Sequence, residues 1–167
     1  MISTGVLSRN VVFRTFGEPM LRTVARATVE VSCASGEILF ECNQPAQSFY
    51  LLVSGTLELW LVTTDRNGNG NAHFSPSGEV RAGEVAGISA LIPPYMYTAT
   101  GQATKPSNLL KIDAHVLRGL AAEDPRFDSA LMHIVAEATM ARLTDARTQL
   151  LAYRGAHGPR NGAGRVS

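Results

Sequence analysis

The sequence has no uninterrupted apolar run near the roughly 20 residues that a membrane-spanning helix needs. Its first residues also lack the charged start and apolar segment of a secretory signal peptide. We therefore expect a cytoplasmic protein. Cysteine is scarce as well, because Cys33 and Cys42 are too few for a disulfide framework, and we expect both to be reduced.

An excess of charge of one sign is also missing. The 15 Lys and Arg residues nearly balance the 14 Asp and Glu residues, and the formal net charge at pH 7 is +1. Such a chain creates no field that draws it to nucleic acid or to anionic lipid. We therefore expect no nucleic-acid partner.

Residues arranged for catalysis or metal binding are lacking. The chain has no HExxH or CxxC motif, no Gly-x-Ser-x-Gly turn to present a serine nucleophile, and dispersed acidic residues. The four histidines stand apart in the sequence, at His73, His115, His133 and His157. We expect no enzyme, no metal and no cofactor.

The chain does have enough apolar residues for one domain, since 45% of its 167 residues are hydrophobic. Residues 1–28 predict a helical lead-in with Arg14, Arg22 and Arg26 on its outer face. A single domain is expected over 29–154. The glycine-rich segment 155–167 has little to bury, and we expect it to be a disordered tail.

Short β-rich runs separated by turn residues predict a sandwich or barrel. The expected strands are residues 29–33, 38–41, 49–53, 56–63, 96–104 and 109–112. Within one of them, Leu57, Leu59 and Leu61 recur with period two, which places all three leucines on the core face.

Two loop regions carry distinct signals. Residues 65–71 contain two Asn-Gly pairs, which favour the tip of a hairpin. A glycine-rich phosphate loop is the alternative, but no Lys-Ser or Lys-Thr pair and no helical pattern follows. Residues 89–92 are long enough for one helical turn before Pro93 ends it.

Beyond residue 113 the pattern becomes helical. Residues 114–122 predict a short helix, and Asp124 followed by Pro125 is a typical start for a longer one. That helix can run to Tyr153, about 29 residues or about 43 Å, which is longer than a small core is wide.

The long helix carries two apolar stripes on nearly opposite sides. One stripe contains Phe127, Leu131, Ile134, Ala138 and Ala141. The other contains Ala136, Met140, Leu143, Ala146 and Leu150. If the first packs on the barrel, the second predicts a partner helix, which a symmetric homodimer supplies. The alternative is a helix that folds back on its own domain.

Four segments together form a recognisable pattern, namely residues 35–40, 49–59, 82–87 and 98–100. The first two are similar to strand–glycine-turn–strand units, and 82–87 is similar to the turn that leads into a phosphate-binding cassette. The whole resembles the cyclic nucleotide-binding domain family of catabolite-activator-like regulators, kinase regulatory subunits and gated channels. The resemblance implies a mainly β fold, a double-stranded β-helix (jelly-roll) barrel with a short N-terminal helix and two C-terminal helices, the last one long.

The cassette implied by this resemblance departs from the family at two side chains. In the family, a Glu directly after the second glycine binds the ribose 2′-hydroxyl, and an Arg ten residues after that glycine pairs with the phosphate. Here the second glycine is Gly87, followed by Ile88, and Tyr97 stands at the arginine position. Glu84 follows the first glycine, where the family's acid serves the turn. Since a charge-assisted contact contributes roughly 1.5–3 kcal/mol, we expect binding of cAMP and cGMP to be weak, altered or absent.

Two interpretations of this pocket remain open. The pocket residues implied by the resemblance are Gly87, Ile88, Ser89, Ala90, Tyr97, Thr98 and Ala99. In one interpretation the pocket is adapted to a less anionic ligand, and Tyr97 stacks on it or donates a hydrogen bond to it. In the other, Ile88 and Tyr97 fill the cavity and no ligand binds.

These features predict a non-catalytic regulatory domain that couples the pocket to the long helix. No recognition helix follows that helix, so direct DNA binding is not expected. The alternative is a ligand-free dimerisation or interaction module. Residues 141–146 look like the end of the long helix in sulfate-permease-type anion transporters, which often end in a cytosolic domain of this family. The chain would then meet a membrane only through a transporter partner or parent chain.

Overall fold

The N-terminal segment is helical, as predicted. The computed structural model describes residues 2–14, 16–64 and 72–157. The segment forms α1 (Thr4–Ser8), the 3₁₀ helix η1 (Val11–Phe13) and α2 (Glu18–Arg26). Arg14, Arg22 and Arg26 are exposed. Phe16 packs against Phe127 of the last helix with 4.7 Å between ring centroids, so this segment shares the main core.

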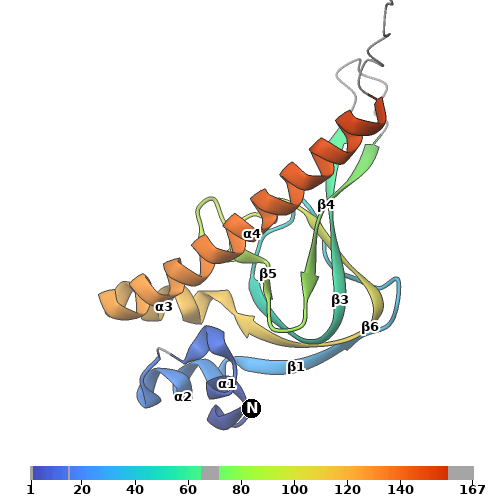
Figure 1. Cartoon of the computed structure of the whole chain (residues 1–167). Coiled ribbons are helices and arrows are strands. Elements are labelled where there is room, and N and C mark those ends of the chain that lie inside the picture. Colours follow the sequence, from blue (N-terminus) through green and yellow to red (C-terminus); the bar gives the residue numbers. More distant parts are fainter. Residues whose placement is uncertain (1, 15, 65–71, 158–167) are drawn as a thin grey trace, which may run out of the picture.

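In the described residues, six antiparallel strands form one curved sheet (Figure 1). The strands are β1 (Thr28–Cys33), β2 (Ile38–Phe40), β3 (Ser48–Thr64), β4 (Ala72–Arg81), β5 (Val85–Ala86) and β6 (Thr100–Asp113). Their order is β1-β6-β3-β4, with β2 paired to β6 and β5 paired to β3. The sheet curls into a jelly roll that is not closed, which confirms the predicted mainly β fold with flanking helices.

Two strands are longer than predicted. The expected strands on either side of Gly55 form one continuous β3. Gly55 adopts a φ of 101°, and the pairing with β6 shifts register on both sides of it, so the strand bends without ending. The two strands expected between 96 and 112 are replaced by β6, which begins at Thr100, because Met96 makes only an isolated bridge to Pro45.

The three leucines of β3 differ in burial. Leu57 is fully buried, Leu59 is half-buried, and Leu61 is 43% exposed. The prediction that all three lie in the core is therefore wrong for Leu61. The far end of the β3–β4 hairpin extends past the other strands and lies beside α4 (Figure 1), so Leu59 and Leu61 line a cavity there. The predicted hairpin tip at 65–71 lies outside the described residues.

The two C-terminal helices begin where the sequence predicts. They are α3 (Ala114–Glu123) and α4 (Pro125–His157). The Asp124 carboxylate caps α4 by accepting hydrogen bonds from the backbone N–H of Arg126 at 2.7 Å and of Phe127 at 3.4 Å. Phe127, Leu131 and Ile134 of the first stripe are buried in the common core, while Ala138 and Ala141 are half-buried.

The second half of α4 leaves the core and continues past Tyr153 to His157. Met140 is 59% exposed and Leu150 is 51% exposed. Over the ranges that the structure describes, no helix combines the length and the apolar content required for a membrane span.

Candidate functional site

A cavity of about 390 Å³ lies between the sheet and α4. Its apolar wall includes Phe40, Leu59, Leu61, Val85, Ile88 and Leu143, and its polar wall includes the hydroxyl residues Ser77, Ser89, Thr98 and Thr139. Because the wall combines strands, the short helix after β5 and the long helix, a molecule that fills the cavity contacts both the sheet and α4.

The short helix η2 (Ile88–Leu91) is positioned by Gly87. Gly87 has a φ of 70°, a conformation that glycine adopts without strain. A Cβ added there would stand 2.8 Å from the Ser48 carbonyl oxygen and 3.3 Å from the Tyr97 ring. The absence of a side chain at Gly87 therefore lets the turn sit directly on β3. The Ala90 N–H then donates to the Gly87 carbonyl at 3.0 Å.

The structure brings five of the seven pocket residues named from the sequence to the cavity wall. These are Gly87, Ile88, Ser89, Thr98 and Ala99. The other two lie behind the wall. Ala90 is fully buried, and its carbonyl accepts a 2.6 Å hydrogen bond from the Arg118 guanidinium of α3.

Tyr97 is a structural residue of the interior. It is 6% exposed, its hydroxyl donates to the Ser48 carbonyl at 2.9 Å, and the same oxygen accepts from the Ser48 N–H at 3.2 Å. Its ring stacks on Phe40 with 4.6 Å between centroids. Burial raises the pKa of Tyr97 above its ordinary value. The phenol is thus neutral and bound to backbone where the resemblance places a phosphate-binding arginine.

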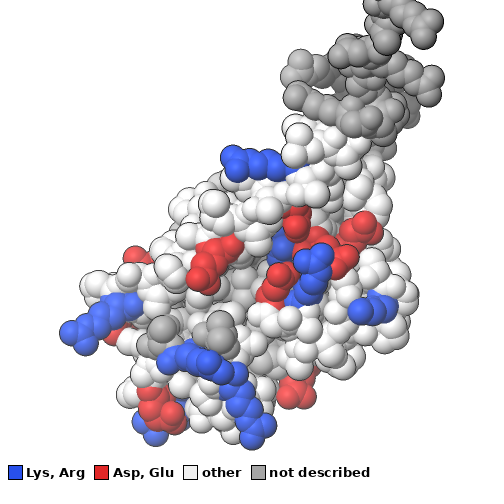
Figure 2. Space-filling model, viewed as in Figure 1, with Lys and Arg blue, Asp and Glu red and all other residues white. Residues whose placement is uncertain are grey.

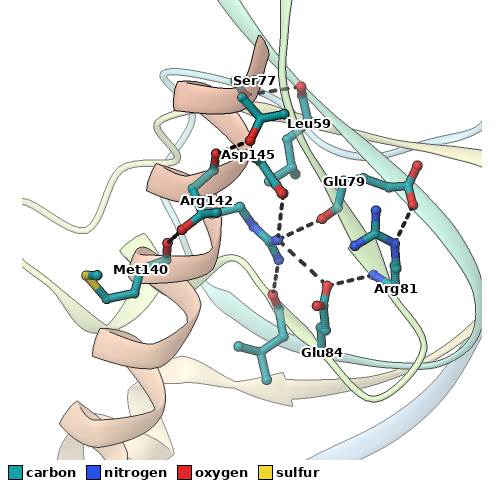
Figure 3. Close-up of polar contacts among 11 residues, drawn as sticks. Leu59, Ser77, Glu79, Arg81, Glu84, Met140, Arg142 and Asp145 are labelled. Atoms are coloured by element: carbon teal, nitrogen blue, oxygen red, sulfur yellow. Dashed lines mark hydrogen bonds and ion pairs between the residues drawn. The ribbon is translucent and has the colours of Figure 1, made fainter. Parts of the chain in front are cut away.

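Arg142 of α4 forms the main polar link between the helix and the sheet (Figure 3). Its guanidinium donates to the Glu79 carbonyl at 2.7 Å and to the Val85 carbonyl at 3.2 Å. Gly78 leaves room for its stem, because a Cβ there would lie 3.3 Å from Arg142 Cδ. The Arg142 side chain is 17% exposed and lines the cavity.

The charges around Arg142 are compensated within the protein. The Glu84 carboxylate lies 3.7 Å and the Asp145 carboxylate 3.8 Å from Arg142 Nη1. Glu84 also accepts the Arg81 N–H at 2.8 Å, and Arg81 pairs with Glu79 at 3.0 Å. Figure 2 shows acidic and basic side chains interleaved on this face. Two arginines against three carboxylates leave this cluster with one net negative charge.

Reasoning from the sequence missed Arg142. The available signal was its position four residues after Ala138 and eight after Ile134, which continues the stripe of α4 that faces the sheet. In the part of the chain that the structure describes, no group of His, Cys, Asp or Glu is arranged to hold a metal ion.

Comparisons with known proteins agree with this architecture. The family model for the cyclic nucleotide-binding domain matches residues 30–124. A crystal structure assigned to the cyclic nucleotide-binding proteins of Geobacter metallireducens GS-15 is 30% identical, with a TM-score of 0.72, and the match covers 86% of this chain and 99% of that one. A comparison with curated proteins finds no match.

Two further solved structures show the same fold. The N-terminal domain of a transcriptional regulator from Streptomyces coelicolor A3(2) is 25% identical with a TM-score of 0.57, covering 81% of this chain and 92% of that one. A cyclic nucleotide-binding domain from Methylobacillus flagellatus KT is 16% identical with a TM-score of 0.66, covering 90% and 81%. Since the family model spans more than half of the sequence, this chain belongs to the cyclic nucleotide-binding domain family.

Proposed function

We propose that this chain is a non-catalytic regulatory domain whose cassette has lost the usual ribose and phosphate contacts, so that it binds cAMP and cGMP weakly or not at all. The observation that carries the proposal is the placement of Tyr97. Its hydroxyl is engaged by both backbone groups of Ser48 and its ring by Phe40, so it has no free group for a phosphate. Ile88 offers no acceptor for a ribose hydroxyl.

The charge distribution supports the same proposal. Arg142 is the cation that lines the cavity, and its guanidinium already binds two carbonyls and lies near two carboxylates. A cyclic phosphate would have to displace those partners and approach a cluster with a net negative charge. Both effects lower affinity for an anion.

The long helix α4 is the element that we propose transmits the state of the cavity to a partner. Leu143 and Arg142 of α4 share the cavity with Ile88 and Val85 of the sheet side. A change in the occupancy of the cavity therefore changes the contact between the helix and the sheet, and a partner that prefers one helix position is thereby regulated.

A homodimer through α4 belongs to the same proposal. Met140 and Leu150 of the predicted dimer stripe are exposed, and Leu151 and Tyr153 add further apolar surface at 69% and 64% exposure. Leu143 and Ala146 line the cavity, so the dimer surface is narrower than the stripe predicted from the sequence. Pairing with a second copy covers these side chains. We also propose a cytoplasmic location, which the free thiols of Cys33 and Cys42 support.

Thermal-shift measurements test the cassette. Millimolar cAMP or cGMP is expected to change the Tm of the wild-type chain by less than about 1 °C, because a ligand stabilises only in proportion to its binding. The double variant Ile88→Glu with Tyr97→Arg restores the two missing contacts and is expected to gain a ligand-dependent Tm rise.

The control places the same two residue types at exposed positions of the same loop. Ile92 and Tyr95 are 40% and 38% exposed, and Ile92→Glu with Tyr95→Arg should produce no ligand-dependent rise. A wild-type chain that cAMP stabilises by several degrees would overturn the proposal.

A further inference from the structure

The cavity beneath α4 has a wall suited to one chemical class of ligand. We propose that it binds an uncharged, mainly apolar small molecule that carries at most a few hydroxyl or carbonyl groups. This inference rests on the proposed function only in using the same cavity, and it names the ligand that would replace a cyclic nucleotide there.

The apolar character of the wall comes from both sides. Leu59 and Leu61 enter from β3, Ile88 from η2, and Leu143 from α4. Leu61 and Leu143 are 43% and 40% exposed, so large aliphatic side chains face this space without a protein partner covering them fully. Filling the space with apolar atoms removes that surface from water, which is favourable.

Some hydroxyl groups of the cavity wall are already hydrogen-bonded within the protein, and others are not. The Ser77 hydroxyl donates to the Leu59 carbonyl at 3.1 Å, and the Thr139 hydroxyl to the Val135 carbonyl at 2.7 Å. The Ser89 and Thr98 hydroxyls make no hydrogen bond to any other described residue. These two neutral groups are therefore available to a ligand as donors or acceptors.

The charged residues beside the cavity disfavour the binding of ions. The Arg142 guanidinium donates two hydrogen bonds, to the Glu79 and Val85 carbonyls, and the Glu84 and Asp145 carboxylates lie beside it. An anion meets net negative charge, and a cation would compete with a guanidinium already in place. A neutral ligand is not repelled by the negative charge and does not compete with the guanidinium. The volume of about 390 Å³ is at the small end of ligand pockets and suits a bicyclic ring system.

A matched pair of probes tests this inference by calorimetric titration of the full chain. Naphthol is neutral and carries one hydroxyl, whereas naphthoate has nearly the same shape and a negative charge. We expect naphthol to bind at least about tenfold more tightly than naphthoate. Asp145→Asn removes one carboxylate of the cluster and is expected to narrow that ratio by improving naphthoate binding.

Two variants locate the site. Ala99 lines the cavity, so Ala99→Phe places a ring in the cavity and is expected to abolish naphthol binding. Ala152→Phe adds the same ring at an exposed position further along α4 and should leave naphthol binding unchanged. Equal affinity for both probes, no binding of naphthol, or unchanged binding in a folded Ala99→Phe variant would each overturn the inference. None of those results bears on the proposed loss of cyclic nucleotide binding. That proposal is contradicted only if the wild-type chain binds cAMP tightly.

Discussion

Tyr97 shows how one residue can turn a ligand contact into a structural one. Its hydroxyl satisfies both backbone groups of Ser48 in the interior. Tyr97→Phe keeps the ring stacked on Phe40 and removes both hydrogen bonds, so we expect it to lower the free energy of unfolding by about 1–3 kcal/mol. Urea denaturation measures this. Tyr95→Phe is the matched control, since Tyr95 is 38% exposed, and an equal loss in both variants would contradict the assigned role.

The same tyrosine predicts a dependence on alkaline pH. Burial raises the pKa of Tyr97 in the folded state above the value of about 10 of an unfolded chain. The unfolded state therefore releases the Tyr97 proton first, so the contribution of Tyr97 to stability is constant below pH of about 10 and falls as the pH rises further. Unfolding free energies measured across this range should fall less steeply for Tyr97→Phe. The same slope in both proteins would show that Tyr97 does not contribute.

At the scale of elements, Arg142 holds the outer half of α4 against the sheet. Arg142→Met keeps most of the apolar stem and removes the bonds to the Glu79 and Val85 carbonyls. We expect faster amide hydrogen exchange in α4 beyond residue 138, because local opening there loses its main polar link. Arg147→Met, at an exposed position on the same helix, is the control. Equal exchange in the two variants would show that Arg142 is not the link.

The elements themselves follow largely from local sequence signals. Asp124 and Pro125 fixed the start of α4 because capping depends on neighbours in the chain. The strand boundary expected at Gly55 was wrong, because pairing with β6 carries β3 through the bend. The exposure of Leu61 was also missed, since period-two alternation gives the face of a strand but not the point where the core ends.

At the scale of the whole molecule, the site was predictable only in part. The residues next to Gly87 and in the following strand could be placed from their likeness to a known cassette. The orientation of Tyr97 depends on Ser48, and the role of Arg142 depends on Glu79 and Val85, all distant in sequence. Such pairs are set by tertiary packing, so the helical period can place Arg142 on the face toward the sheet but cannot identify its partners.

Assembly is also a property of the whole molecule. Met140→Asp places a charge on the exposed apolar surface of α4, and we expect it to convert a dimer to a monomer in sedimentation equilibrium. Gln149→Asp adds the same charge at an exposed polar position on the opposite side of that helix from Met140 and serves as the control for charge alone. A wild-type chain that stays monomeric at high concentration would rule out this surface as a dimer interface.

The most direct test of the altered cassette is calorimetric titration of the wild-type chain with cAMP. Tyr97 and Ile88 provide no ionic or ribose contact, and Arg142 is already bound within the protein. We predict no saturable heat up to about 1 mM cAMP. Saturable binding with a Kd below about 10 µM would mean that the cavity still recognises a cyclic phosphate.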